Sequence, residues 1–157
     1  MKKDRRPTVF DDYYAERLAE PWLLDIALLL DVEANEEPLA VPVGKLRQGG
    51  HIEFCDRLEA EKTVKLLTGR EGFPAVRIIE YEEKGKPPDY FEVRWGDPPP
   101  FDGCDYAEPI CGLLLGLHYG YKEEVIAELV RVRMNEPRRH FTKKGIINLI
   151  RSAMNPR

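Results

Sequence analysis

The sequence predicts an α+β protein, in which a small antiparallel sheet of two β-hairpins is packed with helices and followed by a helical C-terminal subdomain. Two observations predict this class. Residues 39–95 contain short β-branched and aromatic segments separated by turn residues, whereas residues 106–154 carry apolar residues at helical spacing. The break between them is Gly-Asp-Pro-Pro-Pro, because consecutive prolines cannot donate the hydrogen bonds of a strand ladder.

This break defines the expected domain organisation. We expect an α+β domain with an N-terminal helical segment over residues 1–97, and a helical subdomain over residues 98–157 that packs on it. At 157 residues the chain also has the size of one single domain, so both descriptions stay open.

The first expected element is helical and covers residues 10–30, where apolar residues recur close to the i, i+3, i+4 spacing. Pro21 should divide it into two pieces, because proline is tolerated in the first turn of a new helix but not inside one. We expect residues 22–30 to be largely buried. The acidic stretch 31–38 is expected to be a connecting loop.

The expected strands form two hairpins around one helix. Residues 39–43 should pair with residues 51–54 across a glycine-containing turn, and residues 76–81 should pair with residues 90–95. Between the hairpins, the apolar spacing of residues 58–67 predicts a helix that ends at Gly69. Further helices are expected at the following positions: 106–117, 122–134 and 142–154.

The helical third contains a spacing typical of a helix-turn-helix. Gly116 would let two helices approach closely, Gly120 would adopt the positive φ of the turn, and Ile126 would pack the second helix against the first. In a DNA-binding version the start of the second helix reads base edges. Here that start carries Glu123 and Glu124, which DNA phosphates would repel. An ordinary αα-hairpin, with these carboxylates at a helix N-terminus, is the favoured interpretation.

Charge is distributed unevenly along the chain. The net charge is −4, with −9 over residues 1–120 and +5 over residues 121–157. A basic end can bind phosphates or dock on an acidic protein surface. If the chain binds nucleic acid, the expected contacts are the clustered cations of this end: Arg131, Arg133, Arg138, Arg139, Lys143 and Lys144. A solvated basic face is the favoured interpretation of these cations.

Three cysteines, without a dense pattern, argue against a secreted disulfide scaffold, so reduced thiols are expected. A metal site would need several thiolates and imidazoles to converge, and no Cys-x-x-Cys pair is present. The candidates for such a site, or for an enzyme built on the same groups, are His51, Cys55, Cys104, Cys111 and His118. Buried structural thiols and a packing histidine are the favoured interpretation of these residues, and we assign neither a metal nor a cofactor.

Other function classes are disfavoured by the residues. The glycines of segment 44–50 lack the Gly-Lys-Ser/Thr ending of a phosphate-binding loop. No apolar run reaches the ~20 residues of a membrane span, and no secretory signal is recognised, so a cytoplasmic location is expected. No paired groups indicate an active site, so no catalytic residue is assigned.

Several short motifs, in this order along the chain, are shared with a known family: Val-Pro-Val-Gly at 41–44, Arg-Gln-Gly-Gly at 47–50, Leu-Thr-Gly-Arg at 67–70, Gly-Phe-Pro-Ala-Val-Arg at 72–77, Glu-Val-Arg-Trp-Gly-Asp-Pro-Pro at 92–99 and Tyr-Gly-Tyr at 119–121. Over residues 39–127 the chain resembles an uncharacterised actinobacterial family of unknown function. The resemblance implies no activity and transfers no site residue. The two ends of the chain, including everything after Met134, depart from it.

These observations favour binding over catalysis. We expect a small cytoplasmic regulatory or accessory protein that binds another macromolecule, with a protein as the first expectation for the partner. The alternatives are nucleic-acid binding through the helix-turn-helix-like segment and the basic end, and a metal protein or enzyme built on the Cys and His residues. The sequence does not predict the oligomeric state.

Overall fold

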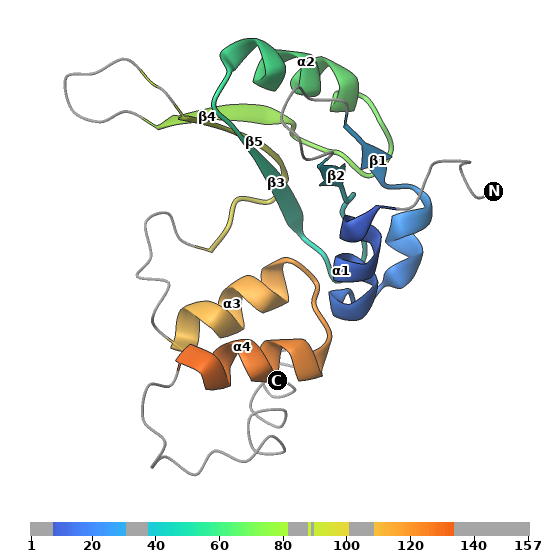
Figure 1. Ribbon diagram of the computed structural model, residues 1–157, viewed down its shortest axis with the longest axis vertical. Helices are drawn as coiled ribbons and strands as arrows, with labels where there is room; N and C mark the ends of the chain where they lie inside the picture. The colour runs from blue at the N-terminus through green and yellow to red at the C-terminus, as the bar shows by residue number, and fades with distance from the viewer. Residues whose placement is uncertain (1–7, 31–37, 82–87, 89, 101–108, 134–157) are drawn as a thin grey trace.

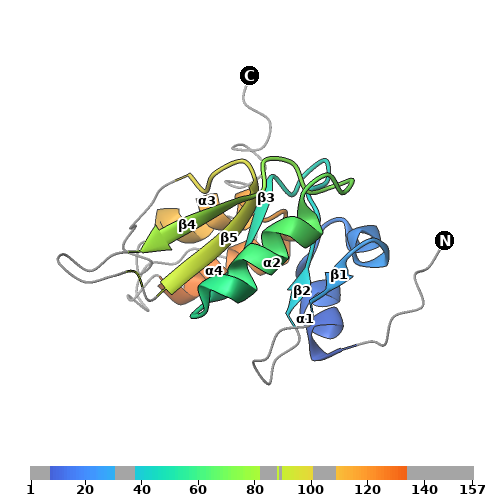
Figure 2. The same cartoon turned by 90° about the horizontal axis from the view of Figure 1, so that it is seen from above.

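The computed structural model describes residues 8–30, 38–81, 88, 90–100 and 109–133, and they form an α+β fold, as predicted (Figure 1). Its centre is an antiparallel sheet of β3 (Gly49–Phe54), β5 (Tyr90–Gly96) and β4 (Arg77–Tyr81), in the order β3-β5-β4. Helix α2 (Arg57–Leu67) covers one face of the sheet, while α3 (Pro109–His118) and α4 (Glu123–Arg133) lie beyond the opposite face (Figures 1 and 2). No helix of the described ranges has both the length and the apolar character that a membrane span requires.

The main core lies between α2 and the central strand. Phe91, Val93 and Trp95 alternate along β5 and are at most 4% exposed, because residues two apart share one face of a strand. They pack with Ala60 and Leu67 of α2. This helix, predicted for residues 58–67, starts one residue earlier, at Arg57, and ends at Leu67 before Gly69. The carboxylate of Asp56 accepts the backbone N–H of Leu58 at 2.8 Å, and Gly69 follows with a φ of +81°.

The hairpin predicted for residues 76–81 and 90–95 is confirmed as β4 and β5. The hairpin predicted for residues 39–43 and 51–54 is wrong. Strand β2 (Leu39–Ala40) pairs with β1 (Leu28–Leu29) in a separate two-stranded sheet, and β3 pairs with β5. The reason is that the loop between β2 and β3 satisfies its amides elsewhere, on the side chain of Glu20 and on the carbonyl of His118.

The N-terminal segment is only partly helical. Helix α1 (Val9–Arg17) starts with a capping box. The carboxylate of Asp11 accepts the backbone N–H of Thr8 at 2.7 Å, and the hydroxyl oxygen of Thr8 accepts the N–H of Phe10 at 3.2 Å. Pro21 opens a new helical turn as predicted, but this turn is the five-residue 3₁₀ helix η1 (Pro21–Asp25), and β1 follows it. The expectation that residues 22–30 are largely buried is wrong for Trp22, which is 51% exposed.

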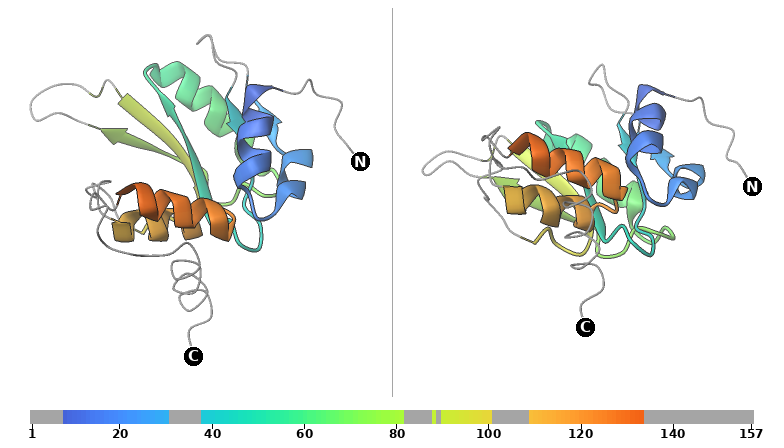
Figure 3. Two further views of the ribbon diagram at one scale, coloured as in Figure 1. Left: turned by 60° about the horizontal axis from the view of Figure 1, so that its bottom comes forward. Right: turned by 90° about the horizontal axis from the view of Figure 1, so that it is seen from below.

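Helices α3 and α4 lie side by side in an antiparallel pair (Figure 3). A Cβ added to Gly116 would lie 2.7 Å from Cγ1 of Ile126, so glycine permits this close approach. Gly120 has a φ of +69° in the connecting turn. These are the roles the sequence predicts for the three residues. The helix predicted for residues 142–154 lies outside the described residues.

The turn between α3 and α4 docks on the rest of the fold. Its Gly120 carbonyl accepts the N–H of Ala19 at 2.9 Å, and the N–H of Lys122 donates to the carbonyl of Arg17 at 2.7 Å. The N–H of Gln48 donates to the carbonyl of His118 at 2.8 Å. The turn therefore contacts both the end of α1 and the loop before β3.

Candidate functional site

Polar side chains gather on the face of the central sheet that α2 does not cover. In β5, Glu92 and Arg94 alternate with the core residues and therefore point to this second face. The strand register places His51 of β3 and Arg77 of β4 directly opposite Arg94, one on each side. One row across three strands thus carries an imidazole and two guanidinium groups. We call this surface the polar face.

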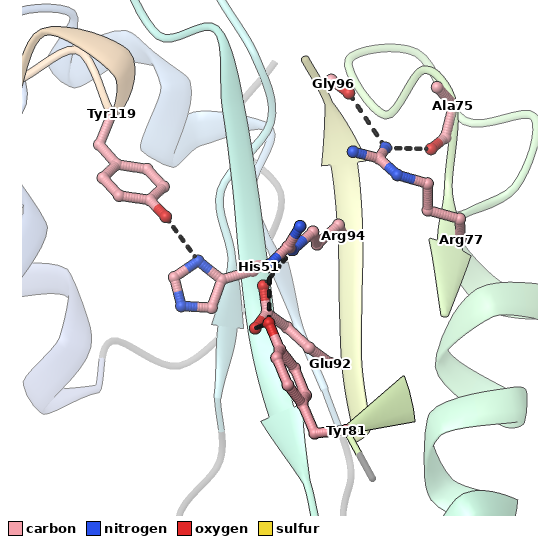
Figure 4. A network of polar contacts seen from close by, with 8 residues as sticks. All are labelled: His51, Ala75, Arg77, Tyr81, Glu92, Arg94, Gly96 and Tyr119. Carbon is pink, nitrogen blue, oxygen red and sulfur yellow. Dashed lines mark hydrogen bonds and ion pairs between the residues drawn. The ribbon is translucent and has the colours of Figure 1, made fainter. Parts of the chain in front are cut away.

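A compact ion-pair network occupies the centre of the polar face (Figure 4). Nε of Arg94 donates to Oε1 of Glu92 at 2.5 Å, and Nη2 of Arg94 donates to the hydroxyl of Tyr81 at 2.7 Å. That hydroxyl in turn donates to Oε2 of Glu92 at 3.0 Å. Arg94 and Glu92 are each 7% exposed. The charges therefore neutralise each other, as burial requires, and the tyrosine occupies a further oxygen of the carboxylate.

His51 connects this network to α3. The hydroxyl of Tyr119 lies 2.9 Å from Nδ1 of His51, and the two rings are in contact (Figure 4). Burial lowers the pKa of His51 below its usual value, while the nearby carboxylate of Glu92 opposes that shift. The imidazole is therefore neutral at pH 7, and its hydrogen bond ties β3 to the end of α3.

A second histidine lies at the end of the polar face. His118, the last residue of α3, is 4% exposed, and its Nε2 would lie 2.9 Å from a Cβ added to Gly49. Burial, and then the positive charge of Arg47, lower the pKa of His118 to about 4. Neither imidazole carries a charge at neutral pH, and buried arginine cations contribute to both shifts.

Arg47 and Glu20 build the loop beneath these histidines. The carboxylate of Glu20, 8% exposed, accepts backbone N–H groups from three successive residues, 45–47, with Leu46 the nearest at 2.6 Å. The guanidinium of Arg47, 3% exposed, donates to the carbonyls of Tyr119 at 3.0 Å and Val41 at 3.4 Å. Burial lowers the pKa of Arg47. Both side chains join segments distant in the sequence, which explains their burial.

The predicted cysteine chemistry is only partly present. Cys55 is a free, exposed thiol, but Cys111 is disulfide-bonded, so the expectation of reduced thiols is wrong at that position. A disulfide sulfur has no thiolate to offer a metal, which removes Cys111 from the metal candidates. His51 and His118 lie on the polar face, and Cys104 is outside the described residues. Within the described part of the chain, no group of three or more His, Cys, Asp or Glu residues is arranged to hold a metal ion.

Most of the predicted nucleic-acid contacts lie outside the described residues. Arg131 lies exposed on α4, where its Nε donates to Oε2 of Glu128 at 2.9 Å and its Nη2 pairs with Oε1. Both bonds join Arg131 to Glu128, one turn earlier on the same helix, so the guanidinium of Arg131 is already paired with a carboxylate. Arg133 ends α4, and nothing is described of its side chain. The remaining cations of that set lie outside the described residues: Arg138, Arg139, Lys143 and Lys144.

Sequence reasoning missed the polar face although part of its signal was visible. The strand Tyr90–Gly96 alternates apolar and charged residues, a period of two that is typical of a strand with one polar face. That alternation identifies Glu92 and Arg94. It does not identify Tyr81 or Tyr119, because the strand register and the docking of α3 bring these side chains to the network.

The comparison with known protein families agrees with the resemblance that the short motifs indicate. Residues 4–148 match the Family of unknown function (DUF6302). The chain belongs to the DUF6302 family. The match extends beyond residues 39–127, so the N-terminal segment and the region up to residue 148 are also part of what DUF6302 proteins share. No curated protein and no solved structure matches this DUF6302 chain.

Proposed function

We propose that this DUF6302 protein is a non-catalytic regulatory or accessory protein that binds another protein through an apolar surface beside η1. Three exposed apolar side chains lie on η1 or on the loop that is hydrogen-bonded to the residue before it: Trp22 on η1, Ile26 at its end and Leu46 on that loop. We group them as the Trp22 surface. Their exposed fractions are 51%, 43% and 41%. The observation that carries the proposal is the exposure of the Trp22 side chain, since tryptophan is enriched among residues that dominate protein–protein binding energy.

Buried neighbouring residues and a backbone hydrogen bond hold this surface in place, which supports the proposal. Leu23 and Ala27 each follow an exposed member of the surface by one residue, and both are fully buried. Leu46 is held at the start of η1, because its backbone N–H donates to the carboxylate of Glu20, the residue before Pro21. A backbone that is already held in place does not have to be ordered on binding, which favours affinity.

Another exposed aromatic nearby is excluded from the surface. Tyr13 of α1 is 44% exposed, but the guanidinium carbon of Arg17 lies 3.7 Å from the centre of its ring. That ring face is therefore covered by a cation–π contact within α1. Asp25 and Lys45 are both exposed and precede Ile26 and Leu46 in the sequence, so charged groups accompany the apolar ones, as is common at the rim of interfaces.

The test compares three forms of the full chain as bait in extracts of the native host: wild type, Trp22→Ala and Leu58→Ala. Leu58 is the matched control, because it is an apolar side chain 65% exposed on α2. We expect one protein to co-purify with wild type and Leu58→Ala but not with Trp22→Ala. The purified partner should then bind wild type at least about tenfold more tightly than Trp22→Ala. Equal capture by all three forms would refute the proposal.

Nucleic-acid binding is the alternative partner class. Arg131, the member of the predicted set whose side chain is described, is paired with Glu128, so the alternative rests on Arg133 and on cations outside the described residues. Binding to mixed-sequence DNA and RNA at two salt concentrations would test it, since phosphate contacts weaken steeply as salt rises. A cytoplasmic location is also part of the proposal. The disulfide of Cys111 is unusual for the cytosol, so fractionation of the native host tests this location directly.

A further inference from the structure

The starting point is an imbalance of charge in one row of the polar face. Arg77 and Arg94 are direct partners in the register of β4 and β5, and directly opposed like charges destabilise a sheet. Arg94 is neutralised by Glu92. Arg77 has no carboxylate partner among the described residues: its side chain donates only to two backbone carbonyls.

The two carbonyls fix the guanidinium of Arg77 in place. Nη1 donates to the carbonyl of Ala75 at 2.8 Å and to that of Gly96 at 3.1 Å, so the side chain bridges the start of β4 and the end of β5 (Figure 4). Of the five N–H donors of the guanidinium, those on Nε and Nη2 remain for another acceptor. Arg77 is only partly buried, which leaves them within reach of solvent, unlike the buried Arg94.

Backbone strain accompanies this arrangement. Ala75 has a φ of +53° and is the only residue other than glycine with a positive φ in the described part of the chain. A side chain at such a φ is unfavourable, and strained residues of this kind concentrate at sites of function. The strained residue is the one whose carbonyl holds Arg77. Gly96, which supplies the other carbonyl, also has a positive φ, of +75°.

We propose that Arg77, oriented by the carbonyls of Ala75 and Gly96, binds the phosphate group of a small anionic ligand at the end of the polar face. The planar fork of a guanidinium matches two oxygens of a phosphate, and the free donors on Nε and Nη2 form that fork. A phosphate dianion attracts the uncompensated charge of Arg77 more strongly than a singly charged oxyanion does, while the neighbouring Arg94–Glu92 ion pair stays intact. This site is separate from the Trp22 surface.

The test measures binding of inorganic phosphate by calorimetry at constant ionic strength, with acetate as the singly charged oxyanion. The variants are Arg77→Gln, Arg77→Lys and the matched control Arg70→Gln. Arg70 is an exposed arginine whose Nε donates only to the carbonyl of Leu66, at the end of α2. We expect phosphate to bind wild type and Arg70→Gln alike, more tightly than acetate, and Arg77→Gln at least about tenfold more weakly.

A second readout separates ligand binding from a purely structural role of Arg77. In wild type, the NMR signal of the Arg77 Nε–H should shift on adding phosphate, and that of Arg70 should not. Arg77→Lys keeps a charge and a donor for the carbonyls but loses the fork, so it should fold and bind phosphate more weakly than wild type. The proposal is overturned if wild type shows no saturable phosphate binding below roughly 10 mM. Equal affinity in Arg77→Gln and Arg70→Gln would also overturn it, and would mark an adventitious ion only.

Discussion

Two alanine substitutions at positive-φ glycines test how the α3–α4 turn is seated. Gly120 and Gly69 have φ values of +69° and +81°, so alanine is strained at both positions. Their surroundings differ. A Cβ at Gly120 would lie 2.7 Å from the backbone N and Cα of Arg47, whereas a Cβ at Gly69 would meet nothing within 4 Å. The pair therefore separates backbone strain from the contact between the turn and the Arg47 loop.

The magnitudes follow from these two contributions. Alanine in the left-handed region costs about 1–2 kcal/mol, which is the whole effect expected for Gly69→Ala. At Gly120 the new methyl must also displace backbone, and overpacking of this kind adds about 1–3 kcal/mol. Gly120→Ala should thus cost about 2–5 kcal/mol. For a chain of this size, each kcal/mol lowers Tm by about 2–4 °C.

Urea unfolding followed by far-UV circular dichroism measures both variants against wild type under identical conditions. The m-value should stay unchanged, which would show that the free energy of unfolding changed and not the extent of the transition. If Gly120→Ala is no more destabilising than Gly69→Ala, the turn does not rest on the Arg47 loop. The docking of α3 and α4 described above would then be refuted.

Three further predictions concern single side chains. His118 has a pKa of about 4 when folded and about 6.5 when unfolded, so the unfolded state binds more protons between these values. The free energy of unfolding should therefore fall as pH drops from 6.5 towards 4. In urea titrations at several pH values, His118→Gln should flatten that dependence. Glu20→Ala leaves the backbone amides of residues 45–47, one of them buried and two part-buried, without their acceptor, so equilibrium unfolding should show a loss of about 1–3 kcal/mol, and a loss below about 0.5 kcal/mol would contradict this assignment. Alkylation of the purified, non-reduced protein followed by peptide mapping should label Cys55 and leave Cys111 unlabelled until reductant is added, and early labelling of Cys111 would contradict its disulfide.

The elements predicted correctly are those whose signals are local. Helix α2 has an amphipathic pattern, a capping aspartate and a terminal glycine, all within the segment itself. The β4–β5 hairpin and the α3–α4 pair likewise follow from short-range spacing, including the roles of Gly116 and Gly120. Each of these signals acts over a few residues, so neighbouring sequence is enough to recognise it.

The errors arise where distant residues decide the structure. Residues 39–43 resemble one half of a hairpin, yet the loop after them is held by Glu20 from the N-terminal segment and by the end of α3. The leucines of β1 were expected in a helix, and their pairing with β2 overrides that local preference. The polar face depends on the same kind of information. The charges of β5 can be recognised in the sequence, but their partners Tyr81 and His51 follow only from the register.

The most direct test of the proposed function places a photo-crosslinking amino acid, p-benzoylphenylalanine, at position 22 of the full chain in the native host, and at position 58 as the reference. Trp22 is the most exposed member of the Trp22 surface, and Leu58 is a more exposed apolar residue on α2. The account predicts that irradiation yields a discrete crosslinked species with a second protein from position 22 and none from position 58. No crosslinked protein from position 22, or the same products from both positions, would contradict it.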